Sequence, residues 1–246
     1  MIDYRNNNNN NTTANKKKVL DVLSELEEIA KKDFLPSIGP IKGEIIEDII
    51  NKYKPKKILE IGTLHGYSAI LMANFLLSLN NDKSYKNNYY NNREIIVTCL
   101  EIDQQLADIA KNNIEQSGLS NRIEVITGDA LKIIPTLKNQ YRFDLVFIDA
   151  VKNHYLRYLK LIEDNSLLNN KSVIVADNVL IYENEMKDYL NYVRNSSRYN
   201  SYTTNTTLEF TKNVKDALEV SIQQIWINTI WRLFLAYKLI GYFDRI

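Results

Sequence analysis

Acidic side chains recur at one kind of position in this sequence, because five short apolar segments each end at or next to one. These residues are Glu60, Glu101, Asp129, Asp149 and Asp177. The carboxyl ends of parallel strands lie at the same edge of a sheet, and ligands of such sheets bind there. If the segments form one sheet, their carboxylates surround one site, where they could bind a ribose, hold a cation or cap helices.

The last two of these acids have the composition of a metal site. Asp149 ends one apolar segment, and Asp177, which ends the next, is followed directly by Asn178. If the two strands are neighbours, two carboxylates and one amide oxygen converge, and Mg²⁺ accepts such hard oxygen ligands. The alternative is that Asp149 caps the next helix and Asp177-Asn178 forms an Asx turn. Lys152 could reach the same edge, and a lysine near a bound cation can act as a general base.

A glycine-containing turn follows the first apolar segment. Glu60 precedes Gly62 and Gly66, and a helical pattern begins after the second glycine. Glycines let the chain turn sharply and let a ligand approach the main chain, so this layout favours a nucleoside ligand. A dinucleotide fingerprint needs Gly-x-Gly-x-x-Gly to bind a pyrophosphate at a helix N-terminus. Because three residues separate the two glycines here, the spacing disfavours a nicotinamide oxidoreductase.

Two further acids suit the remaining parts of a nucleoside. Glu101 could accept hydrogen bonds from a ribose diol, since Asp103 is the better candidate to cap the following helix. Asp129 could meet the exocyclic amine of an adenine, although the pair Gly128-Asp129 is also an ordinary turn.

Composition narrows the class of partner. The 246 residues suffice for one large domain, and 31 Lys and Arg against 30 Asp and Glu leave a formal net charge of +1. Such a chain has no global field that attracts nucleic acid, so we expect a small-molecule partner. The single cysteine, Cys99, can form no intramolecular disulfide, and the N-terminus has no apolar signal-like region. We therefore expect a cytoplasmic protein, as a monomer or weak dimer.

Short apolar runs alternate with helical patterns from residue 58 onward. Continuous apolar runs of this length are typical of parallel strands buried on both faces, and the alternation predicts right-handed crossovers. We expect an α/β fold, a Rossmann-like doubly wound, mostly parallel sheet with a C-terminal antiparallel hairpin. Strands are expected at 58–61, 95–100, 123–126, 145–148 and 173–176, the hairpin at 206–210 and 217–222, and helices at 19–30, 40–54, 68–79, 103–117, 153–164 and 184–194.

The segments at the two ends differ in composition from this domain. Residues 1–17 are polar and Asn-rich, so we expect a disordered leader, then one domain over 18–222 and an apolar extension over 223–246. A polar insertion at 80–92 is expected to form a surface loop. The extension lacks the apolar run of about 20 residues that a membrane span requires. It could contact a membrane surface, pack on the domain or a second subunit, or be a mispredicted gene end.

Together these residues resemble a known family, the class I S-adenosylmethionine-dependent O-methyltransferases, and within it the catechol O-methyltransferase branch. The resemblance covers about 42 to 222, and the combination of Asp149, Lys152, Asp177-Asn178 and Glu209 is its most specific part. The other matching segments are Lys42-Gly43-Glu44-Ile45-Ile46, Leu59-Glu60-Ile61-Gly62, Gly66-Tyr67-Ser68-Ala69, Leu100-Glu101-Ile102, Tyr155-Leu156, Tyr192-Val193-Arg194-Asn195-Ser196-Ser197 and Leu208-Glu209-Phe210.

The resemblance implies a site for S-adenosylmethionine and Mg²⁺. Asp149, Asp177 and Asn178 would hold the metal ion, which binds both oxygens of a vicinal diol. Lys152 would accept the proton of one hydroxyl and Glu209 would hydrogen-bond the other, so these two residues are expected to be catalytic. The implied cofactor-binding residues are Ile38, Lys42, Glu60, Gly62, Gly66, Tyr67, Ser68, Glu101, Ile102, Asp129, Ala130 and Asp149.

The resemblance implies methyl transfer to a hydroxyl of a catechol-like small molecule. Departures from the branch concern the acceptor: Ala150 and Val151 stand where bulky side chains are common, Tyr182 stands where proline is usual, and Phe34 could supply an aromatic gate. Three alternatives stay open. The acceptor could be another phenol or a hydroxylated RNA nucleoside, or the chain could be a cofactor-binding module without turnover.

Overall fold

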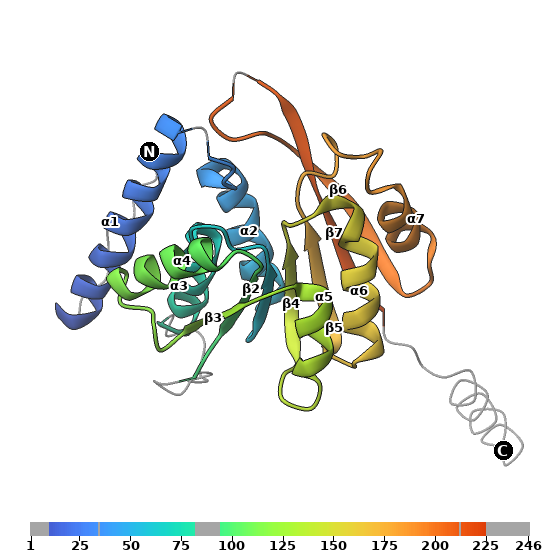
Figure 1. Ribbon diagram of the computed structural model, residues 1–246, viewed down its shortest axis with the longest axis horizontal. Coiled ribbons are helices and arrows are strands. Elements are labelled where there is room, and N and C mark those ends of the chain that lie inside the picture. Colours follow the sequence, from blue (N-terminus) through green and yellow to red (C-terminus); the bar gives the residue numbers. More distant parts are fainter. Residues whose placement is uncertain (1–9, 34, 82–93, 212, 225–246) are drawn as a thin grey trace, which may run out of the picture.

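A seven-stranded sheet with helices on both faces forms this protein (Figure 1). The computed structural model describes residues 10–33, 35–81, 94–211 and 213–224. Its elements, in chain order, are α1 (Asn10–Asp33), α2 (Gly39–Tyr53), β1 (Ile58–Ile61), α3 (Tyr67–Asn81), β2 (Val97–Glu101), α4 (Gln104–Gln116), β3 (Ile123–Thr127), α5 (Ala130–Ile133), η1 (Ile134–Leu137), β4 (Phe143–Ile148), η2 (Lys152–His154), α6 (Tyr155–Asp164), β5 (Leu168–Ala176), α7 (Lys187–Asn195), β6 (Tyr199–Thr207) and β7 (Lys215–Gln223).

The order of the strands is β3-β2-β1-β4-β5-β7-β6. Strands β1 to β5 pair in parallel, whereas β7 pairs antiparallel with both β5 and β6. The direction of chain progression reverses between β1 and β4, because the chain passes from β1 to β2 and β3 on one side and later to β4 and β5 on the other. In open α/β sheets the ligand crevice lies at this switch point, outside the carboxyl ends of the strands. The predicted fold class is confirmed, including the C-terminal hairpin.

Successive residues of the central strands face opposite layers of the core. Ile58 contributes to the layer with α1 to α4, and its neighbour Leu59 contributes to the layer with α5 to α7. The same alternation holds in β4, where Val146 and Phe147 belong to different layers. Figure 1 shows α1 to α4 on one side of the sheet and α6 and α7 on the other. Burial of both faces explains why these strands are continuous apolar runs.

Two short helices, α5 and η1, and the full length of β5 were not anticipated from the sequence. A four-residue helix is too short to show a periodic apolar pattern. Strand β5 begins at Leu168 instead of residue 173. The polar residues 169–171, which precede the apolar run, also belong to the strand. The first strand of the hairpin was expected at 206–210, whereas β6 spans Tyr199–Thr207, because its residues are mostly polar and show no apolar run. Apart from α1, the remaining expected and observed bounds differ by a few residues.

The N-terminal helix begins earlier than the expected domain. Helix α1 includes residues 10–17, which the sequence assigned to a disordered leader. Its apolar stripe, which includes Val19, Leu23 and Leu26, is buried against α3 and α4, and a helix anchored in this way extends through the lysines that precede it. Residues 1–9, Phe34, the insertion from 82 onward and the extension from 225 onward lie outside the described residues. Within the described ranges, no helix is long and apolar enough to cross a membrane.

Candidate active site

The pairing of β4 with β5 brings the predicted metal ligands together. Ile148 at the end of β4 lies opposite Ala176 at the end of β5, and Asp177 N donates to Ile148 O at 3.0 Å. The next residues along the two strands, Asp149 and Asp177, therefore leave the same edge of the sheet side by side. The condition on which the metal hypothesis rests, that these strands are neighbours, is met.

Lys152 joins three side chains at this edge. Its Nζ donates to Asp149 Oδ1 at 2.7 Å, to Asn178 Oδ1 at 2.7 Å and to the hydroxyl of Tyr155 at 3.0 Å. A single ammonium thus contacts one oxygen from each strand end. Asp149 Oδ1 and Asn178 Oδ1 are therefore already arranged around one positive charge, as the ligands of a divalent cation would be.

Tyr155 is a member of this network that the sequence did not mark as functional. Its buried hydroxyl accepts from Lys152 Nζ and from Ala150 N, and it lies 3.4 Å from Asp177 O. Burial raises the pKa of Tyr155 well above its usual value, with the charges of Asp149 and Asp177 adding to the shift. The hydroxyl therefore stays protonated and holds Lys152 near the strand ends. Its position three residues after Lys152, on the same helical face, is the signal that could have found it.

A second buried ammonium lies behind the edge. Lys42 Nζ donates to Asp177 Oδ1 at 2.6 Å and to Asp216 Oδ2 at 2.7 Å, and all three side chains are buried. Burial alone would lower the pKa of Lys42, but the two carboxylates outweigh it and raise that pKa. Lys42 was expected among the cofactor-binding residues, and its ammonium is engaged by these two carboxylates. The sequence did not single out Asp216 at all.

The glycine turn touches the metal edge directly. Gly62 has φ +88°, and a Cβ placed on it would lie 2.1 Å from Asp149 O. Only glycine fits where the chain after β1 passes so close to the chain after β4. Gly66 also has a positive φ, and its N–H donates to Thr63 O at 2.8 Å to close the turn. The turn and the metal candidates therefore flank the switch point of the sheet together.

Glu60 offers an unpaired acceptor beneath this turn. Its Oε1 accepts a hydrogen bond from Ser68 Oγ, whereas its buried Oε2 accepts no hydrogen bond of ordinary geometry from the described residues. Burial raises the pKa of Glu60 to about 7, although Ser68 and, more weakly, the Thr63 hydroxyl and the Cys99 thiol act in the opposite direction. A buried acceptor without a donor is costly, so this oxygen fits a cationic or donor group of a ligand.

Glu101 supports the glycine turn. Its Oε2 accepts from Thr63 N at 3.2 Å and Leu64 N at 2.9 Å, and its Oε1 accepts from Asp103 N at 3.1 Å. Asp103 caps α4, as expected, because its side chain accepts from two backbone N–H groups of that helix. A carboxylate has about four acceptor positions, so Glu101 keeps capacity for a ribose hydroxyl. The neighbouring Ile102 is 68% exposed, which leaves an apolar surface beside it.

The other cofactor candidates lie at or next to the starts of three helices. Asp129 caps α5 by accepting from Leu131 N at 2.9 Å, and Ala130 begins that helix. Tyr67 begins α3, and its hydroxyl donates to Glu27 of α1 at 2.8 Å. Ile38 is buried directly before α2.

Glu209 lies against the first turn of α2. A Cβ on Gly39, which has φ +55°, would lie 2.0 Å from Glu209 Cγ, and Ile41 N donates to Glu209 Oε2 at 3.3 Å. Burial raises the pKa of Glu209, while the hydrogen bond from Ile41 lowers it. In the described part of the chain, no hydrogen bond joins Glu209 to Lys152. Glu209 therefore stands apart from the network that links Asp149, Lys152 and Asn178.

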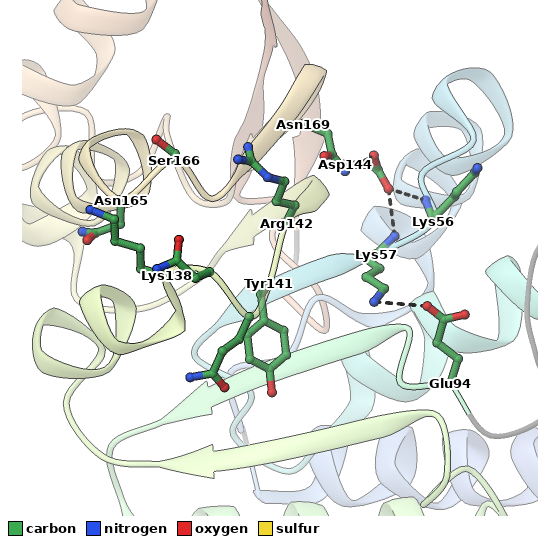
Figure 2. Close-up of a pocket in the computed structure, with 12 residues that line it drawn as sticks. Lys56, Lys57, Glu94, Lys138, Tyr141, Arg142, Asp144, Asn165, Ser166 and Asn169 are labelled. Carbon is green, nitrogen blue, oxygen red and sulfur yellow. Dashed lines mark hydrogen bonds and ion pairs between the residues drawn. The ribbon is translucent and has the colours of Figure 1, made fainter.

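A hollow of about 680 Å³ lies at the opposite edge of the sheet (Figure 2). It is lined near the amino ends of the strands, and none of the predicted site residues belongs to it. Both acidic side chains that line the hollow have protein partners. Asp144 accepts hydrogen bonds from the backbone N–H groups of Lys56 and Lys57, and Glu94 forms an ion pair with Lys57 Nζ at 3.1 Å. The chemistry of the strand ends therefore lies elsewhere.

The donor set at the carboxyl edge is mixed. Within the described ranges, no three His, Cys, Asp or Glu side chains gather as metal ligands. The set found here consists of two carboxylates and one amide oxygen. Such all-oxygen sets suit Mg²⁺, which keeps several waters or substrate oxygens in its shell.

Comparison with known proteins gives the family. A family model described as O-methyltransferase matches residues 10–234. The chain belongs to the O-methyltransferase family. It is 32% identical to catechol O-methyltransferase B of Danio rerio over 82% of this chain and 71% of that protein, and 31% identical to catechol O-methyltransferase of Mus musculus over 83% and 73%. These matches confirm the family that the sequence resembles, the class I S-adenosylmethionine-dependent O-methyltransferases and within them the catechol O-methyltransferase family.

The fold of this O-methyltransferase is shared with solved structures. An O-methyltransferase from Bacillus cereus, solved in complex with SAH, superposes with a TM-score of 0.66 at 24% identity, covering 83% of this chain and 91% of that one. TomG from Streptomyces achromogenes, an O-methyltransferase solved in complex with SAM, gives a TM-score of 0.67 at 21% identity over 82% and 89%. At these identities the likeness supports the fold.

Proposed function

We propose that this chain is an Mg²⁺-dependent O-methyltransferase that transfers a methyl group from S-adenosylmethionine to a hydroxyl of a catechol-like small molecule. One observation carries the proposal. Asp149 Oδ1 and Asn178 Oδ1 are held around one cationic group, 2.7 Å from each, at the strand ends beside Gly62. The same edge thus combines a candidate metal site with a turn suited to a nucleoside ligand.

The residues around the glycine turn fit the proposed methyl donor. Glu60 Oε2 lacks a donor and would accept from the ammonium of the methionine part. Glu101 would accept from the ribose, and the exposed Ile102 would contact the adenine. When bound, S-adenosylmethionine would supply a methyl group on a sulfonium centre, and Mg²⁺ would supply the positive charge that eases loss of a proton from an acceptor hydroxyl.

The chain's own groups then divide the remaining tasks. Asp149, Asp177 and Asn178 would hold the metal ion. The amine form of Lys152 would take the proton of the reacting hydroxyl at Nζ, and Glu209 would accept a hydrogen bond from the second hydroxyl. Because no other bond-making group is required, most of the acceleration would come from alignment and charge stabilisation.

Apolar side chains beside Lys152 suit a flat aromatic acceptor. Val151 adjoins Lys152, and the ring centroid of Tyr182 lies 5.5 Å from Lys152 Nζ. Ile41, which directly precedes Lys42 in the sequence, is also exposed, as is Leu180, which lies two residues after Asn178. Exposed apolar groups gathered around polar ones are typical of ligand sites.

The decisive experiment measures transfer of a labelled methyl group to catechols, monophenols and RNA, with Mg²⁺ and with a chelator. We expect transfer to catechols that is lost on chelation and lost at least about a hundredfold in Asp149→Ala, because a metal ligand is removed. Transfer that survives chelation contradicts the metal-dependent proposal. Preference for monophenols or RNA would replace the catechol assignment, and absence of transfer to every acceptor would favour a module without turnover.

A pH effect is expected from Glu60. Its pKa of about 7 means that the carboxyl is half protonated near neutrality, and a cationic ligand favours the carboxylate. Binding of S-adenosylmethionine should therefore release a proton below about pH 7, and its affinity should rise with pH up to that point and then level off. Calorimetry in buffers of different ionisation enthalpy measures the released proton. Glu60→Gln should bind more weakly and without this pH dependence, and a wild-type affinity independent of pH from 5.5 to 8 would contradict the assignment.

A further inference from the structure

Asp216 lies outside every predicted site, yet its carboxylate contacts two side chains of the catalytic edge. It is fully buried on β7, and its Oδ2 accepts from Lys42 Nζ at 2.7 Å and from Asn178 Nδ2 at 2.9 Å. Pairing between β5 and β7 continues past the end of β5, since Val179 N donates to Ala217 O at 3.0 Å. The antiparallel strand therefore delivers Asp216 directly behind the candidate metal ligands.

The contact with Asp216 determines which end of the Asn178 amide faces the edge. An asparagine side chain carries donors on one side and an acceptor oxygen on the other. Because Nδ2 donates to Asp216, Oδ1 faces the opposite way and accepts from Lys152 Nζ at 2.7 Å. Reversing the amide would set its N–H₂ group against the ammonium and its oxygen against the carboxylate. Both contacts would become repulsive, so the oxygen is presented to the edge.

Lys42 extends the same control to Asp177. Its buried ammonium bridges Asp177 Oδ1 and Asp216 Oδ2, so Asp177 cannot rotate without breaking a charge-assisted hydrogen bond. In the described part of the chain, no donor contacts the other oxygen, Asp177 Oδ2. A buried ammonium between two carboxylates is stable only while both partners remain. Loss of Asp216 would therefore disturb Lys42 and, through it, Asp177.

We propose that Asp216 is a positioning residue that presets two of the three metal ligands, Asn178 directly and Asp177 through Lys42. This inference rests on the proposed function, because it concerns the same divalent cation. Groups that orient metal ligands typically change metal affinity 10–100-fold when they are removed. Asp216 itself would contact neither the acceptor nor the methyl donor, so it acts only through the side chains that it holds.

The test compares isosteric variants of two buried acids on the same strand. Asp216→Asn removes the charge that holds Lys42 and offers Asn178 a weaker, neutral partner. Glu219→Gln removes a carboxylate that is equally buried but binds Arg194 at 2.8 Å and Thr203 at 2.7 Å instead of the edge. Calorimetry with Mn²⁺ in the presence of S-adenosylhomocysteine measures metal affinity. We expect a loss of about 10–100-fold in Asp216→Asn and a change within about twofold in Glu219→Gln.

Two further measurements distinguish a positioning role of Asp216 from a general loss of structure in the variants. The affinity for S-adenosylhomocysteine should stay within about twofold in both variants, and kcat of Asp216→Asn should recover toward the wild-type value at saturating Mg²⁺ while the Mg²⁺ concentration for half-maximal rate rises. Asp216→Ala, which removes both acceptor oxygens, is the second variant and should lose more metal affinity.

The possible failures can be told apart. Wild-type Mn²⁺ affinity in a folded Asp216 variant overturns the inference and leaves the proposed function intact, as does an equal loss of affinity in Glu219→Gln. A loss of S-adenosylhomocysteine binding as large as the loss of Mn²⁺ binding also overturns it, because the role is then structural. If the wild-type chain binds no Mn²⁺, the proposed function fails and the inference fails with it.

Discussion

Gly62→Ala is expected to abolish detectable binding of S-adenosylmethionine and S-adenosylhomocysteine. The new Cβ would lie 2.1 Å from Asp149 O, and backbone atoms cannot yield as a flexible side chain can. The residue would also be strained, since a non-glycine residue in the left-handed region costs about 1–2 kcal/mol. The chain must therefore move either the turn over Glu60 or the backbone of a metal ligand. Calorimetric titration with S-adenosylhomocysteine measures the effect, for which we expect at least about a hundredfold loss, or about 2.7 kcal/mol.

Gly118→Ala is the matched control for this variant. Gly118 also has a positive φ, +76°, but a Cβ there would meet no atom within 4 Å. It therefore carries the same kind of backbone strain without the clash, and it lies after α4, away from the turn. We expect a lower melting temperature in both variants but normal ligand affinity in Gly118→Ala. Equal ligand affinities in the two variants would show that the close approach of Gly62 to Asp149 is unimportant for binding.

Lys152→Met should lower kcat by about 10²–10⁴-fold, the usual contribution of a general base. Methionine has a similar length but no proton acceptor, and it removes the ammonium that contacts Asp149 and Asn178. Because that ammonium competes with a metal ion for the same oxygens, Mn²⁺ affinity should be unchanged or higher. The deficit in kcat should shrink as the pH approaches about 10, where a phenolic hydroxyl ionises without help. Steady-state rates across this pH range, with Mn²⁺ titrations beside them, measure both effects.

Lys160→Met controls for the loss of a lysine in the same region. Lys160 lies on α6, and its Nζ is 3.5 Å from the ring centroid of Tyr192, remote from the strand ends. We expect its kcat to remain within about twofold of wild type. A Lys152→Met enzyme with near wild-type kcat at pH 7, or with a deficit that is constant across pH, would exclude Lys152 as the proton acceptor.

The local pattern of the sequence predicted most of the fold. Apolar runs such as 145–148 form buried strands because a segment with no polar side chain must be covered on both faces, and this requirement is local. The cap at Asp103 and the hairpin near the C-terminus follow from equally local chemistry. The helical residues 10–17 were missed because their order depends on packing of α1 by residues farther along the chain.

The sequence by itself determined the kinds of groups available: carboxylates at strand ends, a glycine where a ligand must approach, and a lysine three residues after Asp149. Only the tertiary structure decided which of them meet. Lys42 and Asp216 are separated by 174 positions, and nothing in the pattern around either one predicts their contact. The contact exists because β7 pairs with β5, and strand order depends on the packing free energy of the whole sheet, whereas periodicity reports only which face of each segment is buried.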